Sequence, residues 1–215
     1  MITHLMYKEF RLNIKPWTYF WFISVLFLIV PAMPYSIGMA YICFFFMFVS
    51  QFDKINQDFT FSAFLPVLKS TKVTARMITI VLVEVVFMIL AVPVAVAHDS
   101  LYATNNPAGM NPNLAFFGLM FMMYAVFNII YLTGTYKQPY RMAWPIVGGA
   151  LVSMIVGAIL TIPVPFIPAL AIINDRGLGH LGAQVTVLVA GFIVYAGLTL
   201  IAHHNAVANF SKVDL

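Results

Sequence analysis

The sequence predicts an all-α integral membrane protein with six transmembrane helices, an amphipathic N-terminal helix and both termini in the cytoplasm. The 215 residues are 62% hydrophobic and only 8% charged, with a mean hydropathy of +0.95, values that a water-soluble domain does not show. Six apolar segments are each long enough, at about 1.5 Å per residue, to cross about 30 Å of hydrocarbon. The cations are also distributed unevenly between alternate loops, and this fixes the orientation.

Ten of the eleven Lys and Arg residues lie at the termini or in every second loop between the apolar segments. Cationic residues near membrane spans stay on the cytoplasmic side during insertion, so we expect these ten to face the cytoplasm. They are Lys8, Arg11, Lys15, Lys54, Lys69, Lys72, Arg76, Lys137, Arg141 and Lys212, whereas Arg176 alone falls on the other side. The net charge of +4 is then expected to meet anionic lipid head groups rather than nucleic acid.

Residues 1–15 are predicted to form an amphipathic elbow helix lying on the membrane surface. At 100° per residue one broad face is apolar, and the opposite face carries His4, Lys8, Arg11 and Lys15. Phe10 lies on the apolar face, and Glu9 interrupts that face. Because a carboxylate against lipid is costly, this part of the face is expected to contact protein. The alternative is a frayed end whose carboxylate reaches water.

The six spans are predicted at about 17–33, 35–52, 77–97, 114–133, 143–163 and 184–202, all within a single transmembrane domain, 1–215. The first two are joined by a short turn, Pro31–Pro34, and so form a tight hairpin. Between the last two spans, residues 164–173 are apolar but too short to cross the bilayer, and they contain Pro165 and Pro168. We expect a helical hairpin that dips into the outer leaflet and packs against protein.

The longest cytoplasmic loop, 53–75, is predicted to carry a short amphipathic helix over Asp58–Leu65. Phe59, Phe61 and Phe64 give it an apolar load that a fully solvated loop does not carry. The simplest interpretation is a docking surface for a cytoplasmic partner. The alternative is that the rings fold back onto the membrane surface.

Glu84 is the one acidic residue deep within a predicted span, eight residues or about 12 Å beyond Arg76. A carboxyl group in hydrocarbon is either neutral or paired. Asn128, nine residues before Lys137, lies at a similar depth and could hydrogen-bond to it. The pair is expected to act either as a clamp between helices or as a polar hinge or cargo contact.

Catalytic chemistry within this chain is not expected. The sequence contains no G-x-x-x-x-G-K-[ST] phosphate loop and no H-E-x-x-H helix. The match to G-x-G-x-x-G at 177–182 follows no strand, and the adjacent His203 and His204 lie at a span end. We therefore expect no metal site and no cofactor in this chain.

Three segments resemble the short type-2 ABC transporter permeases. The run Phe64–Arg76 is similar to their loop before the third span, with a leucine-proline pair and then a cluster of basic and hydroxyl residues. Lys8-Glu9-Phe10 resembles their elbow helix, and 206–215 resembles their tail after the sixth span. The likeness covers the whole chain and is strongest to bacterial phenol-soluble-modulin and antimicrobial peptide exporters. The Pro-Val-Leu-Lys sequence departs from the serine-arginine pair that many relatives carry.

This resemblance implies a half-transporter of the bacterial cytoplasmic membrane that exports amphipathic peptides. It implies a second permease copy, and a separate cytoplasmic ATPase that binds ATP and Mg²⁺ and seats the helix near Asp58, Phe59, Phe61, Phe64 and Leu65. The alternatives are export of a lipid or drug by the same machinery, or an ATP-independent secondary carrier, immunity or sensory subunit. For a proton-coupled carrier, Glu84 is the only deep acid.

Overall fold

The computed structural model describes residues 2–64, 67–102, 104–139, 141, 143–176 and 180–213, and every regular element within them is a helix. In chain order the elements are α1 (Ile2–Lys8), η1 (Glu9–Asn13), η2 (Pro16–Ile29), α2 (Tyr35–Ala40), α3 (Ile42–Ile55), α4 (Asp58–Ala63), α5 (Lys69–Leu101), α6 (Leu114–Lys137), α7 (Ala143–Thr161), η3 (Val164–Phe166), η4 (Pro168–Asn174) and α8 (Leu181–Ser211). The all-helical part of the predicted fold class is confirmed.

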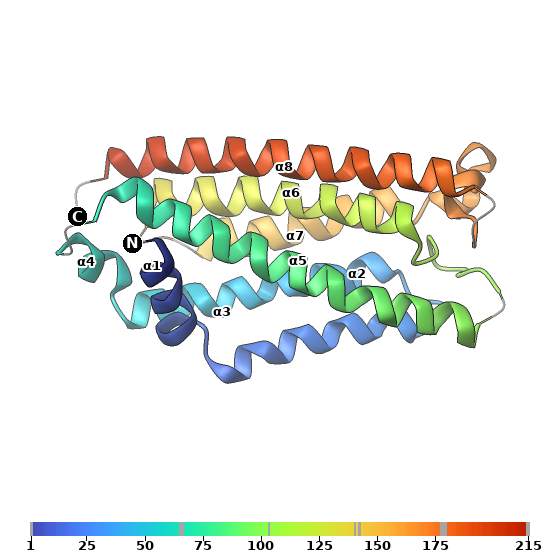
Figure 1. The fold of residues 1–215 in the computed structure, drawn as a ribbon, viewed down its shortest axis with the longest axis horizontal. Helices are drawn as coiled ribbons and strands as arrows, with labels where there is room; N and C mark the ends of the chain where they lie inside the picture. Colours follow the sequence, from blue (N-terminus) through green and yellow to red (C-terminus); the bar gives the residue numbers. More distant parts are fainter. Residues whose placement is uncertain are drawn as a thin grey trace.

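The long helices lie side by side along one axis, and both termini lie at the same end of the bundle (Figure 1). We call this the terminal end, and the opposite end the far end. Five helical stretches are long and apolar enough to cross a membrane, namely 35–55, 69–101, 114–137, 143–166 and 181–211. The segments 2–13 and 16–29 meet at a bend of 87° and would together make a sixth. The chain is thus a helical protein able to cross a membrane five or six times.

The predicted first hairpin differs from the observed one in its local geometry. Residues 16–29 form a 3-10 helix instead of the α-helix expected over 17–33. At about 2 Å per residue its 14 residues rise about 28 Å, nearly the thickness of the hydrocarbon. The second predicted span, 35–52, is divided at Tyr41 into α2 and α3. Phe27 fills the space beside Gly38, where an added Cβ would lie 2.7 Å from the Phe27 Cβ.

The predicted cytoplasmic loop 53–75 is mostly helical. Helix α3 continues to Ile55, α4 occupies Asp58–Ala63, and α5 already begins at Lys69 rather than at residue 77. The physical reason lies in the partners of the charged residues in the first two turns of α5. Lys72 and Arg76 are buried and ion-paired to residues of other elements, which stabilises the helix beyond its apolar part.

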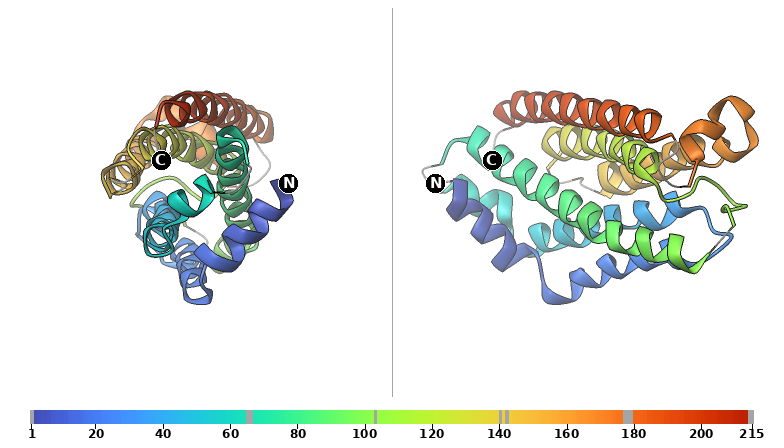
Figure 2. Two further views of the ribbon diagram at one scale, coloured as in Figure 1. Left: turned by 90° about the vertical axis from the view of Figure 1, so that its left-hand side faces the viewer. Right: turned by 45° about the vertical axis from the view of Figure 1, so that its right-hand side comes forward.

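Helices α6 and α8 pack with backbone against backbone. An added Cβ at Gly191 would lie 2.0 Å from the carbonyl oxygen of Gly118, an approach that only glycine permits. Helix α5 instead runs obliquely, beginning near α8 at the terminal end and ending near η2 at the far end (Figures 1 and 2). Its separation from α6 and α8 therefore increases toward the far end.

The far end is closed by the loop before α6 and by η3 and η4. These two 3-10 helices occupy the segment where a helical hairpin was predicted. Asn113 joins the two regions. Its side-chain oxygen caps α6 by accepting a hydrogen bond from the Phe116 amide (3.0 Å), and its amide nitrogen donates to the Ile173 and Asp175 carbonyls.

Candidate functional site

Six charged side chains from five helical elements form a buried cluster at the terminal end. We call it the charge cluster, and its members are Lys8, Glu9, Asp53, Asp58, Lys72 and Arg76. All but Lys8 are buried by residue exposure, so their charges are compensated by one another rather than by water. The cluster ties the elbow region to α3, α4 and α5.

Arg76 is the centre of one half of the charge cluster. Its Nη2 donates to both carboxylate oxygens of Asp53 at 2.7 Å, and it lies 2.9 Å from Oε2 of Glu9. That Glu9 oxygen also accepts a hydrogen bond of 3.2 Å from Asn13. The prediction that the Glu9 side of the elbow meets protein is therefore confirmed, whereas the predicted single amphipathic helix over 1–15 is interrupted by the π-helical turn η1.

Asp58 is the centre of the other half. Its carboxylate pairs with Lys72 at 3.1 Å and with Lys8 of the elbow. Burial alone would raise the pKa of Asp58, but the ammonium groups of Lys72 and Lys8 outweigh burial and lower that pKa. A lowered pKa means that the ion pairs stabilise the fold above about pH 4 and are lost only as the pH falls through the lowered value.

The predicted docking residues of α4 divide into two groups. Asp58 and Phe59 point into the protein. Lys72 lies 4.1 Å from the centroid of the Phe59 ring, which also packs against Tyr136 and Phe210. Phe61 and Phe64, by contrast, are 51% and 83% exposed. Leu65 lies outside the described residues.

Phe10, the remaining predicted elbow residue, is partly buried against the hydrophobic core. The elbow therefore contacts the bundle through Leu5, Glu9, Phe10 and Asn13, while Tyr7 and Leu12 remain exposed. The rest of the protein therefore covers only part of the apolar face that was predicted for the elbow helix.

Glu84 lies at the centre of a second polar cluster within the bundle. Its side chain is fully buried, and Oε2 accepts hydrogen bonds from Tyr195 of α8 (2.6 Å) and Asn128 of α6 (3.0 Å). Asn128 also donates to Thr199 at 3.2 Å. The predicted bond between Glu84 and Asn128 is confirmed. Among the described residues no cation pairs with Glu84, so this geometry suits a neutral carboxyl group that holds α5 to α6 and α8.

Replacing Glu84 with glutamine is expected to leave folding almost unchanged, because the amide oxygen accepts the same two hydrogen bonds. Glu84→Ala leaves Asn128 and Tyr195 with unmet donors and is expected to lower the free energy of unfolding by about 2 kcal/mol. This loss corresponds to a fall of about 4–8 °C in the midpoint of thermal unfolding, measured on the detergent-purified chain. Equal losses in the two variants would show that a charged carboxylate is required.

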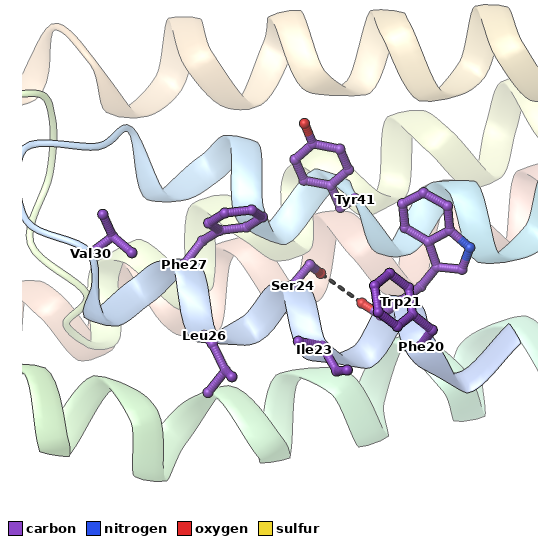
Figure 3. Close-up of a pocket in the computed structure, with 8 residues that line it drawn as sticks. All are labelled: Phe20, Trp21, Ile23, Ser24, Leu26, Phe27, Val30 and Tyr41. Atoms are coloured by element: carbon purple, nitrogen blue, oxygen red, sulfur yellow. Dashed lines mark hydrogen bonds between the residues drawn. The ribbon is translucent and has the colours of Figure 1, made fainter. Parts of the chain in front are cut away.

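An apolar groove runs along η2. Figure 3 shows one part of it, a cavity of about 410 Å³ between η2 and Tyr41. A second cavity of about 480 Å³, toward Pro16, shares Phe20 and Trp21 with it. Residues three apart are eclipsed in a 3-10 helix, which places two rows of η2 side chains along this first cavity: Phe20, Ile23 and Leu26, and Trp21, Ser24, Phe27 and Val30. The Ser24 hydroxyl donates to the Trp21 carbonyl at 2.8 Å, so the lining is effectively apolar.

Sequence reasoning missed Asp53, Lys72 and Arg76 as site residues, because the two cations were used only to fix orientation. One available signal was that four of the seven acids, Glu9, Asp53, Asp58 and Asp214, lie on the predicted side that holds ten cations. Tyr195 and Thr199 were also missed. They lie four residues apart on one face of α8, a signal that becomes useful only once α8 is known to pack on α6.

The described residues contain no group of three or more His, Cys, Asp or Glu side chains that could hold a metal ion. One of the two adjacent histidines, His203, shares a hydrogen bond of 2.9 Å with Thr74. The chain matches no family model, no curated protein and no solved structure. The class of the protein therefore follows from its fold alone: the apolar helices are those of a helical, multi-pass membrane protein.

Proposed function

We propose that this chain is the permease subunit of an ATP-driven exporter in a bacterial cytoplasmic membrane. It spans the membrane six times with both termini in the cytoplasm, works with a second permease copy, and is energised by a separate ATPase subunit. The observation that carries the proposal is the arrangement of α4. Asp58 at the start of this helix is fixed to the elbow and to α5 by buried ion pairs, whereas Phe61 and, just after the helix, Phe64 are exposed.

Exposed phenylalanines on a water-facing segment are typical of a protein contact. A displacement of α4 by a partner would be transmitted by Asp58 to Lys72 of α5 and to Lys8 of the elbow. Arg76 would extend the same movement to α3 through Asp53. Because these pairs are buried and short, the elements that they join would move together at the terminal end. This movement would rotate α5 against the helices that the charge cluster does not join.

The proposed cargo is a hydrophobic or amphipathic peptide. The groove along η2 supports this class, since it is lined by aromatic and aliphatic side chains and extends over most of the length of the helix. Apolar grooves of this kind accept varied apolar partners because their recognition depends on burial rather than on directional hydrogen bonds.

The deciding experiment is a gentle detergent purification of the tagged full chain from its native host, with the co-eluting proteins identified by mass. A co-purified ATPase with a phosphate-binding loop, in about one copy per permease, is the expected result. Repeated recovery of the chain without any nucleotide-binding partner would overturn the proposal.

The double substitution Phe61→Asp and Phe64→Asp is expected to release the ATPase while leaving the chain folded. An interface ring that acts as a hot spot contributes about 2 kcal/mol, or about 30-fold in affinity. The ratio of ATPase to permease in the eluate measures the loss. Leu101→Asp is the matched control, because Leu101 is 64% exposed at the far end. Unchanged co-purification in the double variant would exclude α4 as the docking surface.

A secondary carrier remains the second candidate function, and the burial of Glu84 favours it. A carrier that moves protons through Glu84 would lose transport in Glu84→Gln, because glutamine cannot release a proton. An exporter that uses Glu84 only to hold helices together would retain it. Transport of a labelled amphipathic peptide by the purified, reconstituted complex separates the two.

A further inference from the structure

A cavity of about 270 Å³ opens at the far end, where α5 diverges from α6 and α8. We call it the far-end cavity, and its lining residues come from α5, from the last loop residues before α6 and its start, and from the start of α8. They are Val92, Ala95, Val96, Asp99, Pro112, Asn113, Leu114, Phe117, Leu181 and Gln184. It is separate from the groove along η2, with which it shares no lining residue.

The lining of the far-end cavity changes from apolar to polar along α5. Seven residues, or about 10 Å of helix, separate Val92 from Asp99. The buried apolar walls are formed by Ala95 and Phe117, whereas Asp99, Asn113 and Gln184 supply polar groups. Val92 and Val96 are exposed on the outer surface of α5, so the cavity is accessible from the side that lipid covers.

The polar end is rigid and carries both signs of charge. The Asn113 and Gln184 amides are bound to backbone carbonyls of the η4–α8 connection, which fixes their positions. The Asp99 carboxylate is 43% exposed, and the guanidinium of Arg176 lies 3.2 Å from its Oδ1. A carboxylate that lines the cavity therefore lies beside a guanidinium group just outside the lining.

We propose that the far-end cavity binds a membrane phospholipid with a zwitterionic amine-and-phosphate head group. One acyl chain enters between Val92 and Phe117, the ammonium group meets Asp99, and the phosphate meets Arg176. An anionic head group would bring its phosphate to Arg176, where the phosphate and Asp99 would share the same guanidinium. A zwitterionic head group supplies a second cation, its ammonium group, to Asp99. A folded peptide is too large for this volume. The inference does not depend on the proposed transport function, because it rests on this cavity alone.

The test is native mass spectrometry of the intact chain released from nanodiscs that contain equal parts of phosphatidylethanolamine and phosphatidylglycerol. One retained phosphatidylethanolamine per chain, preferred by about tenfold over phosphatidylglycerol, is the expected result. Retention of both lipids equally, or of neither, would overturn the proposal. Asp99→Asn is expected to abolish the preference, because it removes the partner of the ammonium group.

Val96→Trp fills the mouth of the cavity and is expected to reduce retention about tenfold. Ile89→Trp is its matched control. Residues 89 and 96 lie on the same face of α5 at exposures of 63% and 64%, but Ile89 does not line the cavity. Equal retention in the two variants would place the lipid elsewhere. In the unmodified chain, a photoreactive phosphatidylethanolamine is expected to label 92–99 and 114–117, and labelling confined to η2 would also overturn the proposal.

Discussion

Arg76→Met is expected to lower the free energy of unfolding by about 3–5 kcal/mol, because it leaves two buried carboxylates without their cation. Arg76 is the shared partner of Asp53 and Glu9, which come from different elements. For a chain of this size the loss corresponds to a fall of about 6–20 °C in the midpoint of thermal unfolding. The tryptophan fluorescence of the detergent-purified chain provides the measurement.

Two comparisons separate the loss of the ion pairs from a general effect of losing a charge. Arg11→Met removes an exposed cation from the elbow region and is expected to change stability by less than about 0.5 kcal/mol. Adding Glu9→Gln and Asp53→Asn to Arg76→Met removes the stranded charges and is expected to restore most of the loss. A melting midpoint for Arg76→Met equal to that of Arg11→Met would show that the charge cluster does not hold the elbow to the bundle.

The sequence was sufficient for features that follow from depth and polarity. Asn128 and Glu84 were paired because both lie a similar distance from cations at the ends of their spans, and the bond is present. Glu9 was assigned to a protein contact because a carboxylate facing lipid is costly, and its partner is Arg76. In both cases the cost of an isolated polar group in an apolar medium restricts the possible arrangements.

Features that depend on which helices are neighbours could not be predicted in this way. Phe59, Phe61 and Phe64 are equivalent in composition, yet only Phe59 is buried, because Lys72, Tyr136 and Phe210 converge on its ring. The 3-10 geometry of η2 likewise has no signature in an evenly apolar run such as 17–33. Its packing against Tyr41 and Phe48 belongs to the tertiary structure.

Gly191→Ala is expected to prevent stable folding, with a loss of more than about 4 kcal/mol. The added Cβ would lie 2.0 Å from the carbonyl oxygen and 2.8 Å from the Cα of Gly118. Both atoms belong to the backbone of α6, so no side chain can rotate away, and α6 and α8 must separate along their length. The approach is also too close for a Cβ on the α6 side, because a Cβ at Gly118 would lie 2.5 Å from the Val187 carbonyl oxygen.

Gly197→Ala provides the control for this prediction within the same helix. Apart from the adjoining backbone of α8, no atom lies within 4 Å of the position of its added Cβ, so the substitution is expected to stabilise α8 by up to about 1 kcal/mol through helix propensity alone. The yield of monodisperse chain in size-exclusion chromatography should therefore fall sharply for Gly191→Ala and stay level or rise for Gly197→Ala. Normal yield and melting in Gly191→Ala would mean that α6 and α8 do not approach at Gly118. In that case Glu84, which depends on both helices to place Asn128 and Tyr195, would lose its geometry too.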